Sequence, residues 1–306
     1  MPKTNSEIRK DYFLNKYVII APGRAKRPRD ITVKTVIKET PCVFCPQNID
    51  HDRSLDKIPG KKSWQTLALK NIYPAVALNN PAAYGVQEVI VETPDHGTEM
   101  FEFTSEKIKQ ILGFYAKRTA AISKNKKINY ILVFKNNGSK AGASLSHSHS
   151  QIFATAITPP DVLAELTAAE NYKTEHGVCP YCEIIKKEKN GKRLIYKDKL
   201  ITVIAPYASE YRYEAWLLPN RHLDNITRLN GQELASFAHS IKKILTKLHS
   251  IGLAYNLFLH QTVSNDNQHF YLKIQPRSSV WAGVELGSGL IINSVAPEAA
   301  AKFYRG

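Results

Sequence analysis

The sequence predicts an α+β fold of two tandem halves, each a mostly antiparallel sheet with flanking helices. The main observation is an order of motifs that occurs twice in 306 residues: C-x-x-C, histidine, helix, strand, histidine. The second observation is that strand-like apolar runs outnumber helical patterns. A third helical pattern, at 158–172 with Asp161 near its start, lies between the two copies. We therefore expect the halves to be residues 1–165 and 166–306.

The first half shows each element of the order in turn. A strand at 88–92 runs into a proline and then His96, and a helix is expected to begin near Ser105. The strand at 128–134 follows, and His147 opens the last strand. The predicted helix has apolar residues at helical spacing, namely Ile108, Ile111, Leu112, Tyr115 and Ile122.

The second half repeats this order. A strand at 213–218 leads through a proline to His222, a helix begins near Gly231, and a strand follows at 254–260 before His269. Gly252 is the expected stop of the helix, because glycine is common just past helix ends. The apolar positions of this helix are Leu234, Phe237, Ile241, Ile244, Leu245 and Leu248.

The cysteines and histidines of each half match a tetrahedral zinc site with two thiolates and two imidazoles. All four cysteines of the chain fall in C-x-x-C pairs. We expect the two ligand sets to be Cys42, Cys45, His96 and His147, and Cys179, Cys182, His222 and His269. Four protein ligands close each site, so both zinc ions are expected to be structural. Reduced core thiols or a redox motif are the alternative reading of these pairs.

The segment SLSHSHSQ places His147, His149 and Gln151 at alternate positions. In a strand these side chains share one face. If His147 binds metal, His149 is the histidine left over, and the second half has Tyr271 and Lys273 in place of His149 and Gln151. This asymmetry predicts one active site per chain.

A neutral imidazole serves as a nucleophile on phosphorus when its other ring nitrogen donates to a fixed acceptor. We expect a nearby backbone carbonyl, such as that of Ser148, to be this acceptor for His149. Gln151 can donate to a phosphoryl oxygen but cannot act as an acid. This combination suits a leaving group that needs no proton, such as a phosphate. A general base or a buried structural histidine are the other readings of His149.

The bulk properties restrict the partners. The formal net charge of +15 favours anionic partners but does not choose among nucleic acid, an acidic membrane surface and phosphorylated small molecules. No apolar run approaches the roughly 20 residues that span a membrane. Aromatic residues do not alternate with basic ones in a ladder, so nucleic-acid binding is not expected. The first residues lack the pattern of a signal peptide, and we expect a cytoplasmic protein.

Taken together, these motifs resemble the galactose-1-phosphate uridylyltransferase family of the histidine-triad superfamily, whose members carry H-x-H-x-Q. The similarity covers nearly the whole chain and includes DYFLNKYVIIAPGRAKRP, PCVFC, EVIVETPDH and ILVFKNNGSKAGASLSHSHSQ. It implies two histidine-triad-like halves, a homodimer, and transfer of a nucleoside monophosphate between a nucleotide sugar and a sugar 1-phosphate through a covalent nucleotidyl-histidine. His149 is the implied nucleophile, with Gln151 and Ser144 as catalytic partners.

The resemblance also implies a set of substrate-binding residues. These are Arg24 and Arg27 in GRAKRP, Asn71 in LKNIYPA, Asn136 in FKNNG and, more loosely, Glu285 in WAGVELGSG, a segment that is expected to reach the sugar bound by the other subunit. Arginine suits a diphosphate because its guanidinium binds two oxygens at once.

Two features differ from the best-known uridylyltransferases. The motif reads His-Ser-His instead of His-Pro-His, and Lys135 replaces a glutamate. With the second C-x-x-C, they are similar to the ADP-glucose phosphorylase branch, which uses inorganic phosphate. An adenylyltransferase of that type, or of the dinucleoside phosphorylase type, is thus an alternative. A zinc-containing nucleotide- or RNA-binding protein without turnover is a third hypothesis, supported by the charge.

Overall fold

The computed structural model describes residues 6–26, 41–61, 63–263, 268–278 and 280–306. Its first-half strands are β1 (Glu7–Lys10), β2 (Tyr17–Ile20), β3 (Ser54–Pro59), β4 (Trp64–Lys70), β5 (Gly85–Val91), β6 (Tyr130–Asn137) and β7 (His149–Thr155). The later strands are β8 (Leu194–Lys197), β9 (Ile201–Ile204), β10 (Ala215–Pro219), β11 (Tyr255–His260), β12 (Tyr271–Pro276) and β13 (Ile291–Asn293). The α-helices are α1 (Ser105–Ile122), α2 (Pro160–His176), α3 (Pro180–Glu188), α4 (Gly231–Ser250), α5 (Gly283–Ser288) and α6 (Pro297–Arg305).

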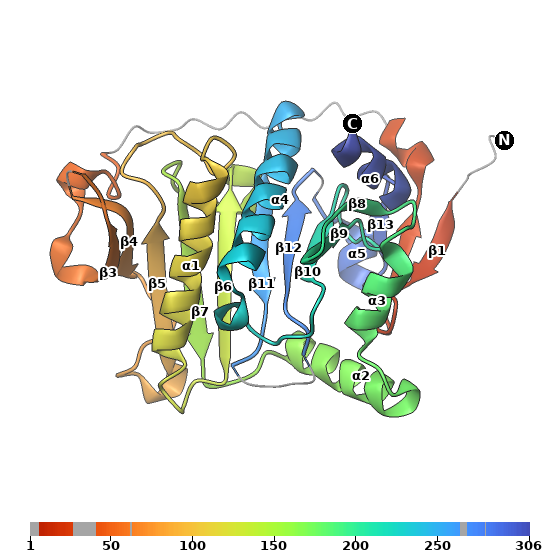
Figure 1. The fold of residues 1–306 in the computed structure, drawn as a ribbon, viewed down its shortest axis with the longest axis horizontal. Coiled ribbons are helices and arrows are strands. Elements are labelled where there is room, and N and C mark those ends of the chain that lie inside the picture. The colour runs from red at the N-terminus through yellow and green to blue at the C-terminus, as the bar shows by residue number, and fades with distance from the viewer. Residues whose placement is uncertain (1–5, 27–40, 62, 264–267, 279) are drawn as a thin grey trace.

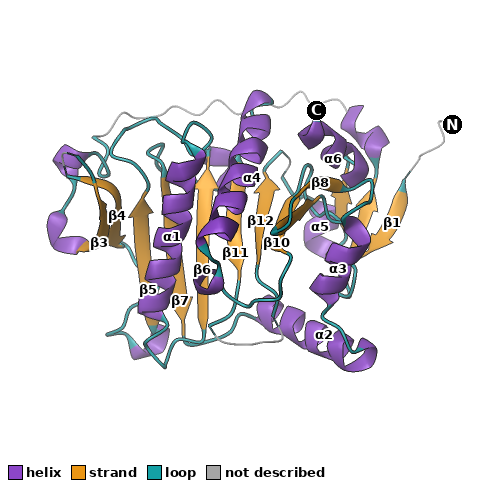
Figure 2. Ribbon diagram, in the orientation of Figure 1, coloured by secondary structure: helices purple, strands orange, loops and turns teal. Residues whose placement is uncertain are grey.

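One ten-stranded sheet carries both halves (Figures 1 and 2). Its order is β3-β4-β5-β7-β6-β11-β12-β10-β9-β8, and every neighbouring pair is antiparallel. Read outward from the β6–β11 seam, the two halves have the same strand sequence. The predicted α+β class and the two tandem halves are therefore confirmed, with the five strands of each half joined edge to edge. The last strands start at His149 and Tyr271, two residues later than expected.

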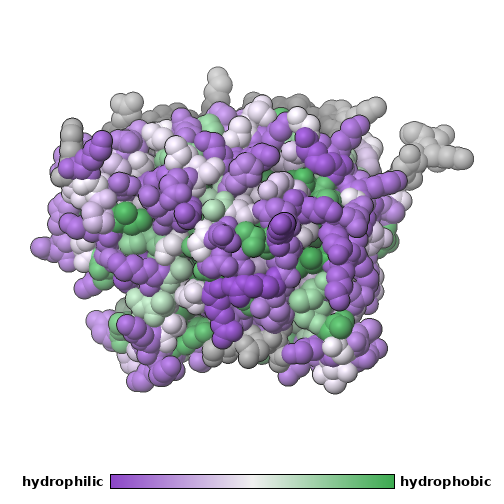
Figure 3. All heavy atoms as spheres, viewed as in Figure 1, coloured by the Kyte–Doolittle hydropathy of each residue, from purple (hydrophilic) through white to green (hydrophobic). Residues whose placement is uncertain are grey.

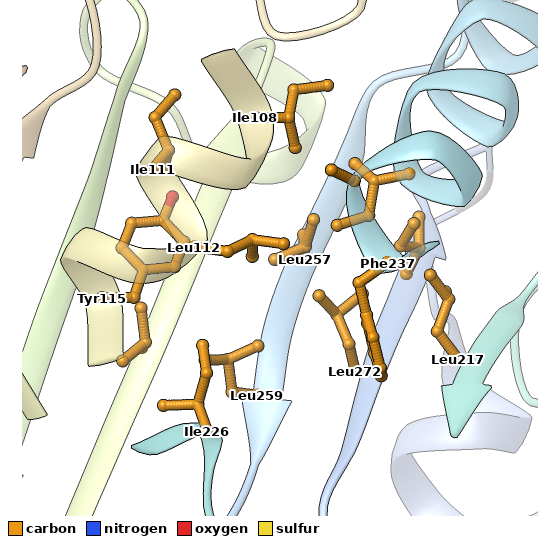
Figure 4. Packing of buried hydrophobic residues seen from close by; sticks show 14 of the residues in the cluster. Ile108, Ile111, Leu112, Tyr115, Leu217, Ile226, Phe237, Leu257, Leu259 and Leu272 are labelled. Carbon is orange, nitrogen blue, oxygen red and sulfur yellow. The ribbon is translucent and has the colours of Figure 1, made fainter. Parts of the chain in front are cut away.

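The two long helices pack side by side on one face of this sheet, α1 over the first half and α4 over the second. Figure 4 shows Leu112 of α1 pointing at Leu257 and Phe237 of α4 lying beside Leu272, both of which belong to the central strands. The predicted apolar positions of both helices are buried, and only Leu234 is partly exposed. Burial of each such side chain contributes about 1.5–3 kcal/mol to folding.

Local sequence sets the ends of these helices. The Thr104 hydroxyl accepts from the backbone N–H of Lys107 at the start of α1. Asn230 and Glu233 form a capping box at the start of α4. Gly252, the predicted stop, adopts φ +64°, a left-handed conformation that glycine reaches without strain.

The opposite face of the sheet is covered differently in the two halves. Over the first half, Phe44 and Ile49 pack on Trp64 and Leu69. Over the second half, α3 and residues 12–13 pack on Trp216 and Tyr271. These N-terminal residues follow β1, which belongs to a separate three-stranded sheet with the order β1-β2-β13. Residues 6–20 thus lie against the second half of the chain.

The helix-bearing face in Figure 3 is mostly hydrophilic, with apolar residues in small separate groups. Within the described part of the chain, no helix is both long and apolar enough to cross a membrane.

Candidate active site and metal centres

The first C-x-x-C pair meets the histidines predicted for it. Cys42 Sγ lies 3.7 Å from His147 Nδ1, and Cys45 Sγ lies 3.5 Å from His96 Nδ1. All four ligand atoms lie within 4.8 Å of one another. Bonds of about 2.3 Å to sulfur and 2.0–2.1 Å to nitrogen place tetrahedral ligand atoms roughly 3.5 Å apart. The four residues fit a tetrahedral metal ion.

The second set forms a cluster of the same kind. Cys182 Sγ lies 3.7 Å from His222 Nδ1 and 3.6 Å from His269 Nδ1, and Cys179 completes the group. The two histidine rings are 5.1 Å apart at 86°, against 5.3 Å and 79° in the first cluster. The structure thus holds two Cys2His2 clusters that could bind metal ions.

A backbone carbonyl orients the buried histidine of each cluster. His147 Nε2 donates to the carbonyl of Thr93 at 2.7 Å, and His269 Nε2 donates to the carbonyl of Pro219 at 3.0 Å. Because a carbonyl only accepts, Nε2 carries the proton and Nδ1 faces the thiols with its lone pair. Such second partners set the tautomer and the direction of metal-binding histidines.

His149 is left outside this cluster, with its Nδ1 directed at a backbone carbonyl. The acceptor is the carbonyl of His147, at 2.8 Å, and not that of Ser148 as we expected. The Ser148 carbonyl instead accepts the backbone N–H of Glu92 at 3.1 Å. This hydrogen bond makes Nε2 the lone-pair nitrogen of the ring, and among the described residues Nε2 has no hydrogen-bond partner.

The ring of His149 lies on the same face as that of His147, as strand alternation predicts. Phe44 contacts both rings, with centroids 5.1 Å from His149 and 6.2 Å from His147. Only 8% of His149 is exposed. Burial lowers the pKa of His149, although the hydrogen bond to the His147 carbonyl opposes this. The imidazole is therefore neutral near pH 7.

Gln151 and Asn136 flank the histidine on neighbouring strands. Gln151 is half-buried and pairs with Val89 on one side and Phe134 on the other. The Asn136 side-chain oxygen accepts from Asn256 Nδ2 at 2.8 Å. Its amide N–H groups are thereby left as donors for a ligand.

Asn256 belongs to the second half and was not anticipated from the sequence. Its amide also donates to the carbonyl of Ala141 at 2.8 Å, which ties the loop before β7 to β11. The pairing of Asn256 with Asn136 across the seam creates this contact. No motif in the sequence marks Asn256, because its role depends on the register between the two halves.

Ser144 and Asn71 lie in loops on the first half. Ser144 is exposed in the segment between η5 (Ser139–Ala141) and β7. The Asn71 side-chain oxygen accepts the backbone N–H of Tyr73 at 2.8 Å, so it also stabilises the turn after β4.

The remaining predicted residues lie elsewhere. Arg24 is exposed in η1 (Pro22–Lys26), directly after β2. Glu285 accepts the backbone N–H of Ala282 at 3.0 Å and caps its own helix, α5, beside β13. Figure 1 places α5 and the red turn of η1 near the three-stranded sheet, in the other half of the molecule from β7. Arg27 lies outside the described residues.

Comparison with known proteins agrees with this geometry. The family model for galactose-1-phosphate uridyl transferase, N-terminal domain, matches residues 2–159. ADP-glucose phosphorylase of Arabidopsis thaliana is 32% identical over 98% of this chain and 92% of its own length. Galactose-1-phosphate uridylyltransferase of Thermotoga maritima is 25% identical over 98% of both chains. The crystal structure of the Arabidopsis enzyme with bound ADP-glucose superposes with a TM-score of 0.87, covering 98% of this chain and 99% of that one. A uridylyltransferase structure is 28% identical over 98% of this chain and 97% of its own, and it superposes with a TM-score of 0.78.

Proposed function

Since this chain belongs to the galactose-1-phosphate uridylyltransferase family and is a nucleotidyltransferase, we propose that it moves a nucleoside monophosphate between a nucleotide sugar and a sugar 1-phosphate, with His149 as the covalent carrier. The observation that carries the proposal is the contrast between His147 and His149, which are two residues apart. Nδ1 of His147 faces two thiols, whereas Nδ1 of His149 is tied to a carbonyl and Nε2 is left to react.

The transfer occurs in two displacements. Nε2 of His149 attacks the α-phosphorus of the nucleotide sugar, the Nε2–P bond forms, and the bond from phosphorus to the bridging oxygen breaks. The sugar 1-phosphate leaves with that oxygen and its electron pair, and needs no proton because phosphate is a good leaving group. A second sugar 1-phosphate then attacks the same phosphorus and releases His149 unchanged. Gln151 donates to an oxygen of the transferring phosphoryl group, and Ser144 assists in binding the same group.

The other predicted residues hold the substrate. The amide of Asn136, oriented by Asn256, donates to the nucleotide sugar, and Asn71 contributes from the turn after β4. Arg24, Arg27 and Glu285 act on substrate bound to a second copy, since Arg24 and Glu285 lie near the three-stranded sheet, away from the strand of their own chain that carries His149. We therefore propose a homodimer with two shared active sites.

We assign zinc to both Cys2His2 clusters. Two thiolates and two imidazoles with no open position are typical of structural zinc. In the first cluster, the ion would hold Cys42, Cys45, His96 and His147 and so anchor the start of the catalytic strand. Residues 1–165 then form the half with the active site, and residues 166–306 the half with a second metal site. Reduced C-x-x-C pairs fit a cytoplasmic location.

An ADP-glucose phosphorylase activity is the second candidate. The 32% identity to the Arabidopsis enzyme favours it, as do Lys135 and Ser148. The donor would then be ADP-glucose and the acceptor inorganic phosphate, with the same histidine as carrier.

The test is to incubate the protein separately with UDP-glucose and ADP-glucose and to analyse peptides by mass spectrometry. The expected result is a mass increase equal to UMP or AMP on the peptide that contains His149. Glucose 1-phosphate or inorganic phosphate should then discharge the adduct, and the more effective acceptor distinguishes the two candidates. A non-catalytic nucleotide- or RNA-binding protein would form no adduct and would bind nucleotide equally well as the His149→Ala variant.

A further inference from the structure

A cluster of polar residues is buried directly behind the catalytic strand. Because side chains alternate along a strand, Ser148 and Ser150 point away from the face that carries the histidines. The Ser148 hydroxyl donates to Glu92 Oε2 at 2.7 Å, and the Ser150 hydroxyl donates to the other oxygen of Glu92. Lys135 Nζ donates to Glu92 Oε2 at 2.8 Å and to Ser148 Oγ at 2.9 Å.

This ion pair is almost completely removed from water. Lys135 is 1% exposed and Glu92 is 0% exposed. Burial by itself raises the pKa of Glu92, but the charge of Lys135 and the hydrogen bonds outweigh it and lower the pKa, so the carboxylate is ionised. Desolvation of such a pair offsets most of its attraction, and apolar residues of similar volume stabilise a fold equally well. Stability alone therefore does not explain the pair.

The position of the Lys135–Glu92 pair beside the backbone of His149 explains its presence better. The β6–β7 ladder runs from Tyr130–Thr155 to Phe134–Gln151 and stops before His149. Beyond the end of that ladder, Lys135 Nζ donates to the carbonyl of His149 at 3.3 Å. On the other side of the strand, the backbone N–H of Glu92 binds the Ser148 carbonyl at 3.1 Å. The peptide groups on both sides of His149 are thus held by these two residues.

We propose that Lys135 and Glu92 are positioning residues that hold the backbone of His149 so that its Nε2 is aimed at phosphorus. The proposal rests on the nucleotidyl-transfer function given above. Neither residue touches substrate, so their loss should slow the formation of nucleotidyl-histidine and leave the KM for nucleotide sugar nearly unchanged.

The test compares two ion pairs, one with its glutamate in β5 and one with its glutamate directly after the end of β5. Lys135→Met/Glu92→Gln removes both charges behind His149. Arg118→Met/Glu88→Gln removes a less deeply buried pair between α1 and β5, with side chains 12% and 3% exposed and N–O distances of 2.9 and 2.6 Å. For each variant one measures the single-turnover rate of adduct formation, KM, zinc content and Tm. The first pair should lose about 10- to 100-fold in rate, as is typical for residues that orient a reacting group. The Arg118→Met/Glu88→Gln control should have a lower Tm and an unchanged rate of adduct formation.

Several outcomes would overturn the positioning role. One is an unchanged rate in the Lys135→Met/Glu92→Gln variant. Another is an equal loss of rate in the Arg118→Met/Glu88→Gln control, and a third is a loss confined to KM. If the first variant does not fold, Ser148→Ala decides, since it removes one hydroxyl from the cluster and should still slow adduct formation. Absence of any adduct in the wild-type protein contradicts the proposed function itself, which separates that failure from this one.

Discussion

The two halves of the sheet share a scaffold and differ in what fills the position beside the metal cluster. In the first half, Gln151 pairs with the small residue Val89, and in the second half Lys273 pairs with Trp216. The Lys273 ammonium lies 5.0 Å from the centroid of that indole ring. The side chain of Lys273 thus lies against an aromatic ring, whereas Gln151 pairs with an aliphatic residue.

The nucleophile position differs in the same way. Tyr271 replaces His149 and is 1% exposed. The ring of His260 stacks on the Tyr271 ring, with centroids 4.3 Å apart and an angle of 7° between the planes. The Tyr271 hydroxyl donates to Glu165 of α2 at 3.0 Å. Duplication therefore preserved the metal scaffold in both halves, while in the second half the position of the nucleophile lies in a small cavity whose walls include residues of α2 and of the N-terminal segment.

The largest expected effect contrasts the two equivalent residues directly. His149→Ala should lower nucleotidyl transfer by at least about 10⁴-fold, because the covalent carrier is lost. Tyr271→Phe should leave the rate unchanged, since it removes only the hydroxyl bound to Glu165. Exchange of label between a sugar 1-phosphate and its nucleotide sugar measures both. Exchange by His149→Ala at the wild-type rate would show that another group carries the nucleotide.

The metal clusters should differ in their effect on activity. Wild-type protein should contain about two zinc ions per chain, and Cys42→Ser or Cys179→Ser about one. Cys42→Ser should also lower the transfer rate by at least about 10-fold, because His147 precedes the catalytic strand. Cys179→Ser should mainly lower Tm. Elemental analysis with rate measurements checks this, and less than one zinc ion per wild-type chain would contradict the metal assignment.

The seam between the halves is tested at Asn256. Asn256→Ala removes the bond that orients Asn136 and leaves the Ala141 carbonyl unpaired, so kcat/KM should fall by roughly 5- to 30-fold. Asn220→Ala is a matched control, since that side chain also makes two hydrogen bonds, to Thr202 and to the Asp198 carbonyl, within the second half. The control should keep full kcat/KM. Equal loss in both variants would indicate a general packing defect.

The smallest expected effect concerns Glu214, which lines the cavity beside Tyr271 and Lys273 in the second half. Burial raises its pKa to about 7, with Lys273 opposing and Glu210 adding to the shift. The folded state thus binds the proton more tightly than the unfolded state, so stability is full below about pH 4.5 and falls as pH rises through about 7. The loss is at most about 3 kcal/mol.

Glu214→Gln should flatten this dependence, because the amide does not titrate. Urea unfolding at several values between pH 5 and 8 measures the slope for both proteins. The same slope in both would assign the titration to another group.

Much of the molecule could be predicted from its sequence. Helical spacing located α1 and α4, and Gly252 marked the end of α4, because these signals are local. The repeated cysteine and histidine spacing identified both ligand sets, which the structure brings together. The short strands β1, β2, β8, β9 and β13 were not anticipated, since runs of three or four residues carry little periodic signal.

By itself, the sequence determined the duplication, the metal ligands and the one histidine that differs from its counterpart, because each depends on residue type and spacing along the chain. Only the tertiary structure decided which carbonyl orients His149, that Asn256 reaches Asn136, and that Lys135 and Glu92 meet behind the catalytic strand. These contacts join residues from different strands, and their distances depend on strand order and register. The joining of ten strands into one sheet sets that register.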